Sequence, residues 1–297
     1  MRKKEKVKEV YGMISDMELK KPYVKVVHAL FLIISVFLGA LCLLPLVWLL
    51  FSAFKDTKEF LQIPPTFLPK KVDLNKLLSV WDEYYFGQAF VNTGILAIGD
   101  IIFSISLNGL AGYVLSRLKP RGSKLVFMVI LWTMLLPNNV SQVPLFMTFT
   151  HFPITGWNLS NTYWPMWLMA GANSYYILLF KSFFDSLSIS FFESAKLDGC
   201  TNLQMFYKIV IPLSIPVIAV ICIFQFNGAW GAYFWPLLLF NDGKHYVIGQ
   251  RMFVLKTHAP IDKYAVAMIL IIIPPSIIYL IFQKQIMGGL TIGGVKG

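Results

Sequence analysis

The stretch His28–Phe54, HALFLIISVFLGALCLLPLVWLLFSAF, contains no acidic residue, lysine or arginine over 27 positions. Crossing the hydrocarbon layer of a membrane takes about 20 mostly apolar residues, so this run is long enough for one crossing. It is also longer than the apolar segment of a cleavable signal peptide, which has about 7–15 residues. The stretch therefore predicts a membrane-spanning helix that stays in the mature protein.

Five further runs of the same kind follow along the chain. Lipid offers the backbone no hydrogen-bond partners, so runs that cross it must be helical. Only 14% of all residues are charged, whereas a soluble domain has about 25%. The sequence predicts an all-α integral membrane protein with about six transmembrane helices. The five further runs are Phe86–Ser116, Leu125–Phe149, Asn161–Phe180, Ile209–Phe240 (expected to begin outside the membrane) and Tyr264–Gln283.

The distribution of basic residues predicts how these helices are oriented. Of the 26 lysines and arginines, 17 lie in the N-terminal segment, in the loops after the second and fourth runs, and in the C-terminal tail. Cytoplasmic loops of membrane proteins are enriched in basic residues. We therefore expect a cytoplasmic N-terminal segment 1–27, a transmembrane domain 28–284 and a cytoplasmic tail 285–297. The net charge of +11 follows from this orientation and does not require a nucleic-acid partner.

Residues for catalysis or metal binding do not form any recognisable pattern. The three cysteines and four histidines are scattered, with no spacing typical of metal ligands. No Ser/His/Asp set is apparent, and no glycine-rich loop with a following helix could hold phosphates. We therefore expect no catalytic residue, no metal site and no cofactor on this chain.

The cytoplasmic segment of about 185–213 predicts a helix, a turn and a second helix. Ser190 is expected to cap the first helix, with Glu193 three residues later in the position of a capping box. Gly199 is expected to end that helix, because glycine adopts the turn conformation easily. Such an elbow is either an ordinary connector or an element that fills a groove on another protein.

A second amphipathic segment, Asn202–Ile211, leads from this elbow back toward the membrane. Pro212 and Pro216 follow it at the start of the fifth run. Because proline disrupts a helix, these two residues predict a break or a bend between the segment and the membrane-spanning helix.

The residues from Glu193 to Gly199, with Ile209 and Pro212 downstream, resemble the EAA loop of ABC importer permeases. Ser194 replaces the usual alanine and Ile211 the usual leucine, and Leu187-Ser188 stands where Ile-Pro is usual. Short motifs elsewhere narrow the resemblance to the second permease of maltose-type importers of di- and oligosaccharides. They are Pro64-Pro65 through Pro69, Asn92-Thr93, Ala111-Gly112-Tyr113 with Arg117, Pro137, Pro144-Leu145, Asn161-Thr162-Tyr163, Trp230, Trp235-Pro236-Leu237 and the tail Gly289–Gly297.

The resemblance implies a type I ABC importer permease in a bacterial-type cytoplasmic membrane. The chain would form half of a translocation path together with a second homologous permease. ATP and Mg²⁺ would bind to two separate ATPase subunits, and an extracellular or periplasmic solute-binding protein would deliver the carbohydrate. The residues implied in ATPase docking are Glu193, Ser194, Ala195, Asp198 and Gly199.

Polar and aromatic residues in the fifth run are candidates for the substrate path. Amides hydrogen-bond to sugar hydroxyls, and aromatic faces cover apolar sugar rings. An aromatic belt at the membrane interface is the alternative explanation for the aromatic members. The family's usual Trp-Asn-Asp is Trp230-Gly231-Ala232 here, a change that either removes the family's sugar contacts at this position or widens the passage. The candidates are Gln225, Asn227, Trp230 and Tyr233, with Asn138, Asn139 and Gln142 near the helix-breaking Pro137 as weaker ones.

Asp100 is the one charged residue inside a predicted span. Because a charge at mid-membrane is costly, we expect Asp100 to pair with a polar group of another span, with a role in gating or substrate binding as the alternative. A secondary transporter working alone would need several intramembrane charges. An ABC permease for a non-sugar solute is the second alternative. A pore for anions would require buried arginine or lysine, and the predicted spans contain neither.

Overall fold

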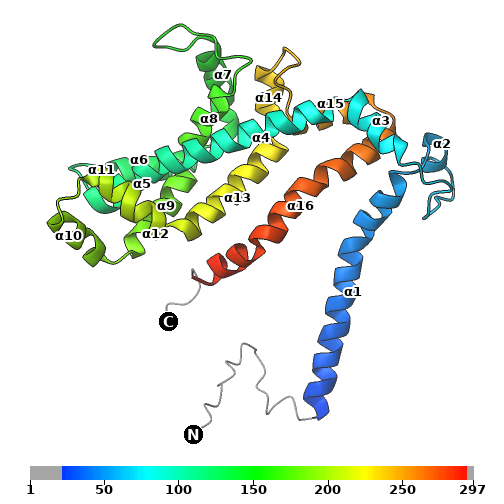
Figure 1. Ribbon diagram of the computed structural model, residues 1–297, viewed down its shortest axis with the longest axis horizontal. Helices are drawn as coiled ribbons and strands as arrows, with labels where there is room; N and C mark the ends of the chain where they lie inside the picture. Colours follow the sequence, from blue (N-terminus) through cyan, green and yellow to red (C-terminus); the bar gives the residue numbers. More distant parts are fainter. Residues whose placement is uncertain (1–21, 293–297) are drawn as a thin grey trace. The chain divides into compact units, whose positions relative to one another are not determined.

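The computed structural model describes residues 22–292, with side chains up to Gln283 except that of Asn138. Within this range the chain consists of helices and connecting loops, without strands, as expected from the sequence (Figure 1). The predictions for residues 1–21 and 293–297 lie outside it. The chain divides into two units, of which the first ends at Val72 and the second begins at Asp73.

The first unit contains one long helix followed by a folded loop. Helix α1, Pro22–Ser52, begins six residues before the first predicted run and ends two residues before the end of that run. The apolar side chains of α1 are exposed along most of its length, as suits a helix in contact with lipid or a partner.

The loop after α1 contains the short helix α2, Thr57–Phe60. The buried Lys55 donates to the carbonyl of Thr66. The Glu59 carboxylate accepts hydrogen bonds from the Thr66 hydroxyl at 3.2 Å and from the Lys70 amide at 2.9 Å. These bonds fold the proline-rich segment back over α2.

The second unit is built around a continuous helix of 33 residues, Phe86–Leu118. It consists of α4, Phe86–Phe103, and α5, Gly109–Tyr113, with π-helical turns at Ser104–Asn108 and Val114–Leu118. The other main helices are α3 (Asn75–Glu83), α6 (Ser123–Thr133), α7 (Gln142–Thr150), α8 (Trp164–Gly171), α9 (Ser174–Ser186), α10 (Ile189–Leu197), α11 (Asn202–Met205), α12 (Ile211–Leu213), α13 (Ile215–Gly231), α14 (Phe234–Leu239), α15 (Ile248–His258) and α16 (Ile261–Ile292).

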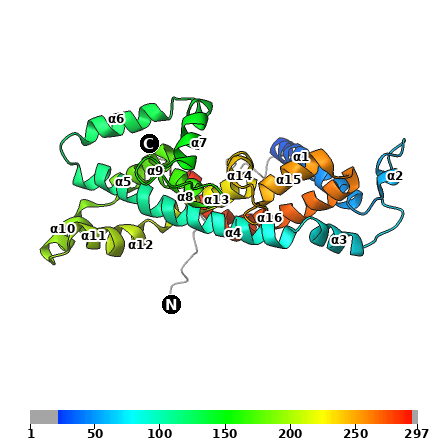
Figure 2. The ribbon, with the colours of Figure 1, turned by 90° about the horizontal axis from the view of Figure 1, so that it is seen from above.

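Helices α4 and α13 lie side by side and form the centre of the second unit (Figures 1 and 2). Helix α16 packs on α13, and α8 packs on α4. Small residues of α4 allow the close approach of α8, since a Cβ at Gly99 would lie 2.0 Å from the indole nitrogen of Trp167. The indole of Trp167 donates to the carbonyl of Leu96 at 3.2 Å.

The third and fourth predicted runs are each two helices rather than one. In the third, Pro137 has extended backbone between α6 and a 3₁₀ turn, because proline lacks the amide that a helix would need there. In the fourth, Asn173 separates α8 from α9, and its side chain accepts from the amides of Tyr175 and Tyr176 at the start of α9.

Three described helices are long and apolar enough to cross a membrane: Pro22–Ser52, Phe86–Leu118 and Ile261–Gln283. A fourth crossing results if Asn202–Leu213 and Ile215–Gly231 count as one broken span, bent by 79°. This bend lies between Pro212 and Pro216, where the sequence predicts it. The described helices therefore support several crossings, whereas the count of six stays a prediction.

Candidate functional site

The predicted elbow is present as helices α10 and α11 joined by a tight turn. The cap of α10 is Ser188, whose hydroxyl accepts from the Ser190 amide, so the prediction of Ser190 as the cap is wrong. The capping box instead begins α11, where Gln204 N–H donates to the Thr201 hydroxyl and Thr201 N–H donates to the Gln204 side chain. Both helices of the elbow therefore begin at side-chain caps.

Gly199 ends α10 as predicted. Its φ of +76° is a conformation that favours glycine. The Gly199 amide donates to the Lys196 carbonyl at 3.1 Å, and the Cys200 amide donates to the Ala195 carbonyl at 2.9 Å. These two bonds form a Schellman motif, which satisfies carbonyls at the end of the helix. The turn is thus fixed by its own backbone.

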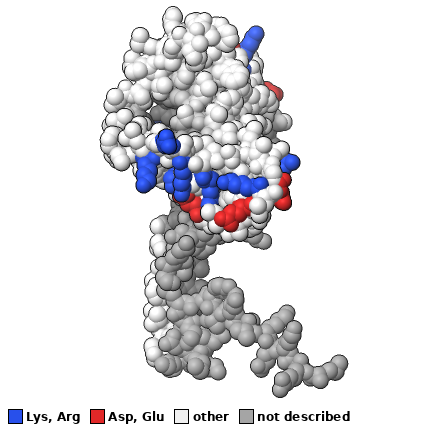
Figure 3. All heavy atoms as spheres, turned by 90° about the vertical axis from the view of Figure 1, so that its left-hand side faces the viewer, with Lys and Arg blue, Asp and Glu red and all other residues white. Residues whose placement is uncertain are grey.

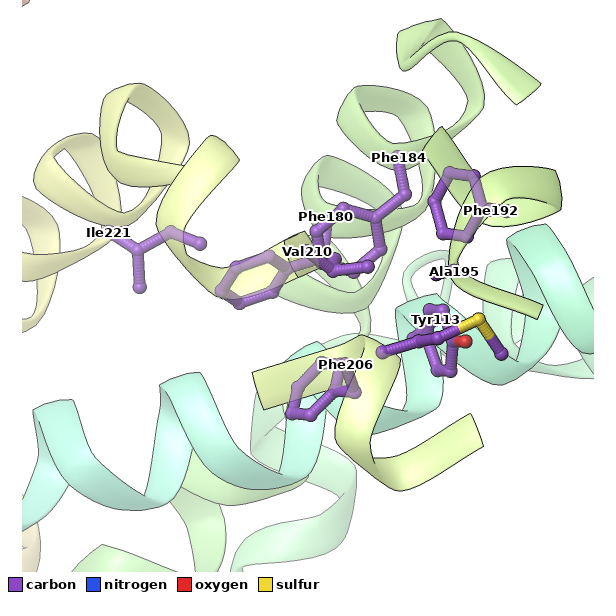
Figure 4. Close-up of a cluster of buried hydrophobic side chains, with 9 residues drawn as sticks. Tyr113, Phe180, Phe184, Phe192, Ala195, Phe206, Val210 and Ile221 are labelled. Atoms are coloured by element: carbon purple, nitrogen blue, oxygen red, sulfur yellow. The ribbon is translucent and has the colours of Figure 1, made fainter. Parts of the chain in front are cut away.

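Buried aromatic side chains hold the inner face of the elbow against the helices behind it (Figure 4). Phe192 and Ala195 of α10 are buried, and they lie three positions apart on one face. Ala195 therefore points into the protein and is not available for contact with a partner, unlike the other four predicted docking residues. The cluster consists of Tyr113, Phe180, Phe184, Phe192, Ala195, Met205, Phe206, Val210 and Ile221.

Arg117 fastens the chain between α9 and α10 to the end of the long helix. Its guanidinium donates to the carbonyl of Leu187 at 2.6 Å and to the carbonyl of Phe184, and it lies 4.4 Å from the ring centre of Phe192. These carbonyls belong to the last turn of α9 and to the residue that follows it. One side chain therefore connects the long helix, α9 and α10.

A charged cluster next to Arg117 strengthens the same junction. The Asp185 carboxylate accepts from the Ser116 hydroxyl at 2.6 Å and forms an ion pair with Lys181 at 2.6 Å. Burial alone would raise the pKa of Asp185, but the hydrogen bonds from Lys181 and Ser116 lower it below its usual value. The carboxylate is thus held in its charged form.

The outer face of the elbow is polar at some positions and apolar at others. Glu193, Ser194, Asp198 and Gly199 are exposed, as a docking role requires. Leu197 is 90% exposed, and Ile189 and Phe191 are also exposed. Lysine and arginine side chains gather at this end of the molecule (Figure 3). Exposed apolar residues beside charged ones are typical of a surface that binds another protein.

A cavity of about 280 Å³ lies between α4 and α13, and none of its lining residues belongs to the elbow. Asp100 and Gln225 both line it, and each is only 7% exposed. Neither Oδ1 of Asp100 nor Nε2 of Gln225 has a hydrogen-bond partner within the described chain. The cavity lining consists of Leu96, Asp100, Met166, Gln225, Gly228, Ala229, Gly231, Ala232, Tyr233, Phe234, Trp235 and Pro236.

Two of the predicted path residues, Gln225 and Tyr233, line this cavity, and two do not. The Trp230 indole donates to the carbonyl of Ile271 at 3.0 Å and thus faces α16. The Asn227 amide donates to the carbonyl of Ile223, in the preceding turn of its own helix. Trp230 therefore packs against α16, and Asn227 bonds to the backbone of its own helix.

The weaker path candidates also lie away from the cavity. Gln142 donates to the Asn139 side chain at 3.2 Å in the break between α6 and α7, and both residues are exposed or nearly so. The side chain of Asn138 is outside the described part.

The expected pairing of Asp100 with a polar group of another span is not found for its Oδ1 atom.

Two polar residues, Asn92 and Thr93, hold the loop between α14 and α15. The sequence indicated them only as part of a motif shared with the ABC importer permeases. The Asn92 amide donates to the carbonyls of Lys244 and Tyr246, at 2.6 and 2.9 Å. The Thr93 hydroxyl accepts from the Ile248 amide at 2.9 Å. These partners lie more than 150 positions away, so no local signal in the sequence could have identified their role.

Comparisons with known proteins agree with this architecture. Residues 107–289 match the family described as binding-protein-dependent transport system inner membrane component. The diacetylchitobiose uptake system permease protein of Streptomyces coelicolor is 28% identical, with 90% of this chain and 87% of the relative covered.

Solved structures share the fold. One chain of a bacterial ABC transporter that imports the acidic polysaccharide alginate has a TM-score of 0.77 at 22% identity, covering 89% of this chain and 98% of that one. A bacterial alginate ABC transporter in complex with its alginate pentasaccharide-bound periplasmic protein gives a TM-score of 0.58 at 17% identity, with 92% and 96% covered.

Proposed function

The chain belongs to the family of binding-protein-dependent transport system inner membrane components, and we propose that the cargo of its transporter is a di- or oligosaccharide. As a member of this family it is a permease subunit of an importer. The family assignment also argues against the alternative interpretation, a secondary transporter that works alone. Support for a sugar cargo comes from the 28% identical diacetylchitobiose permease and from the hydrogen-bonding cavity between α4 and α13.

The elbow of α10 and α11 is proposed to dock on a separate ATPase subunit in the cytosol. The observation that supports this most directly is the outer face of the elbow. Within six positions of the chain it exposes one apolar residue, Leu197, and two acidic residues, Glu193 and Asp198. The gathering of lysine and arginine at this end fits a cytoplasmic location. Under this proposal both chain termini lie on the cytoplasmic side as well.

Coupling would then pass from the elbow into the membrane through rigid contacts. When two ATPase subunits bind ATP and close, each would move the elbow that it holds. Arg117 and the cluster around Phe192 connect the elbow to the long helix that contains Asp100. Movement of the elbow would therefore change the cavity between α4 and α13, as alternating access requires.

The remaining partners follow from the same scheme. A second homologous permease would complete the path, and six crossings in this chain would match the predicted orientation. The loop held by Asn92 and Thr93 lies away from the elbow (Figure 1), and we propose that a solute-binding protein delivers the sugar near it.

Leu197→Asp tests the docking role of the elbow. Leu197 is 90% exposed, so the substitution removes no internal contact, and we expect the variant to fold and insert normally. A buried carboxylate without a partner is costly at an interface. We therefore expect the amount of ATPase that co-purifies with the permease, and the rate of sugar uptake, to fall at least tenfold.

Ile154→Asp provides the matched control, because Ile154 is 87% exposed in the loop after α7. Co-purification of ATPase with this variant should equal that of the original protein. Undiminished ATPase recovery with Leu197→Asp would refute docking at the elbow, as would labelling of a cysteine at position 197 from outside intact cells.

A further inference from the structure

We infer that the cavity between α4 and α13 is a sugar-binding site on this subunit and that it selects uncharged saccharides over acidic ones. The inference rests on the proposed function and names the substrate class of that transporter. It starts from two side chains, Asp100 and Gln225, that come from different helices and line the same cavity.

The position of Asp100 is fixed by the packing of the helix on which it lies. Gly99, the preceding residue, contacts the indole of Trp167, and Leu96 accepts the hydrogen bond from that indole. Gln225 lies on α13, the helix that packs directly on α4. Both side chains therefore lie on two helices that pack against each other rather than on a loop.

One atom of each side chain, Oδ1 of Asp100 and Nε2 of Gln225, is buried without a hydrogen-bond partner among the described residues. A buried polar group without a hydrogen bond is costly, so such groups are rarely left unpaired in a finished assembly. Oδ1 of Asp100 accepts hydrogen bonds and Nε2 of Gln225 donates them. Together they match a group that both donates and accepts, which is the property of a sugar hydroxyl.

The rest of the lining suits the other surfaces of a sugar. Tyr233 and Trp235 bring aromatic rings to the cavity, and one face of Tyr233 is stacked on Phe253 at a ring distance of 5.3 Å. Aromatic rings with an apolar body and a polar edge bind partly polar surfaces well. A Cβ at Gly228 or Gly231 would meet no atom within 4 Å, so these glycines leave the wall open.

The size of the cavity favours one sugar unit at a time. Its volume of about 280 Å³ lies near the lower limit of about 300 Å³ for typical small-molecule sites. A longer oligosaccharide would extend from it along the path that the second permease completes.

The charges of the lining determine which saccharides fit. Among the described residues that line the cavity there is no lysine, arginine or histidine, and Asp100 is the single acidic one. The carboxylate of a uronic acid would meet this carboxyl group without a counter-charge in a site that is poorly solvated. We therefore expect a neutral cargo such as diacetylchitobiose, unlike the acidic alginate that the transporter of similar fold imports.

Uptake by the complete transporter in membrane vesicles tests this inference. The neutral probes are diacetylchitobiose, arabinotriose and maltotriose, and the acidic probe is an alginate trisaccharide. We expect a neutral probe to be taken up at least tenfold better than the acidic one. Gln225→Met keeps the length of the side chain but removes its donor, and it should raise the KM for the neutral probe about tenfold with little change in kcat.

Asp100→Asn removes the charge at constant shape. We expect it to raise the KM for the neutral probe and to reduce the preference for neutral over acidic probe about tenfold. Asn227→Ala is the control, since Asn227 is an amide on the same helix that does not line the cavity. Its uptake kinetics should equal those of the original protein.

Three outcomes would overturn the inference while leaving the proposed function in place. The first is a wild-type transporter that prefers the alginate trisaccharide. The second is that, in both variants, the KM for the neutral probe and the preference for the neutral over the acidic probe stay within twofold of the wild-type values. The third is loss of the second permease from the purified complex of either variant, because Asp100 or Gln225 would then bind that subunit rather than sugar. Uptake of none of the probes by the wild type would instead contradict the proposed sugar cargo.

Discussion

Arg117→Met is expected to detach α10 from the rest of the permease and to abolish uptake. The guanidinium of Arg117 donates to the carbonyls of Leu187 and Phe184, and methionine cannot donate to either. Without Arg117 the Leu187 carbonyl loses this donor at a cost of about 1–3 kcal/mol, whereas the Phe184 carbonyl keeps the Leu187 amide at 3.2 Å. The contact of the guanidinium with the Phe192 ring is lost as well. We therefore expect the free energy of unfolding to fall by about 2 kcal/mol.

The effect is measured as the midpoint of thermal unfolding of the purified protein and as the recovery of co-purifying ATPase. Arg117→Lys should restore part of both, because lysine keeps a charged donor but lacks the planar guanidinium that lies over the Phe192 ring. Arg121→Met is the matched control, since Arg121 is exposed in the loop that follows the same helix. Equal stability of Arg117→Met and Arg121→Met would show that the contacts of Arg117 do not hold the elbow.

The elbow could be predicted from sequence because its determinants are local. Gly199 ends α10 through bonds to residues only three and five positions earlier, and such short-range bonds leave a signal in composition. The sequence pattern predicts the cap two residues too late, because Ser188 and Ser190 are equally good capping residues. Only the backbone shows that Ser188 is extended, as a cap must be.

The cavity could be predicted only in part, because sequence does not show which side of a buried helix faces which neighbour. In α13 each residue advances about 100° around the axis, so Gln225 and Trp230 point about 140° apart. One lines the cavity and the other faces α16. Helix α13 is apolar on all sides, so its composition gave no preferred face.

Gly99→Ala is expected to destabilise the junction of α4 and α8 and, through it, the cavity. The new Cβ would lie 2.0 Å from Nε1 of Trp167, well inside any contact that atoms tolerate. The indole cannot simply turn away, because it stacks on Phe103 and Tyr163, with ring distances of 5.9 and 5.7 Å. Overpacking of this kind costs about 1–3 kcal/mol, and the bond from Trp167 to the Leu96 carbonyl would be lost as well.

Gly94→Ala is the internal control for this prediction, because it makes the same change five residues earlier in α4, where a Cβ meets no atom within 4 Å. The unfolding midpoint should fall for Gly99→Ala and stay or rise for Gly94→Ala, since alanine favours the helix. Trp167→Leu should make Gly99→Ala nearly neutral, because the clashing ring is gone, and the double-mutant cycle would then give a coupling energy of about 1–3 kcal/mol. Additive effects of the two substitutions would mean that Gly99 and Trp167 do not touch. Because Asp100 follows Gly99 directly, a displaced α8 should also alter the kinetics of sugar uptake in Gly99→Ala and leave them unchanged in Gly94→Ala.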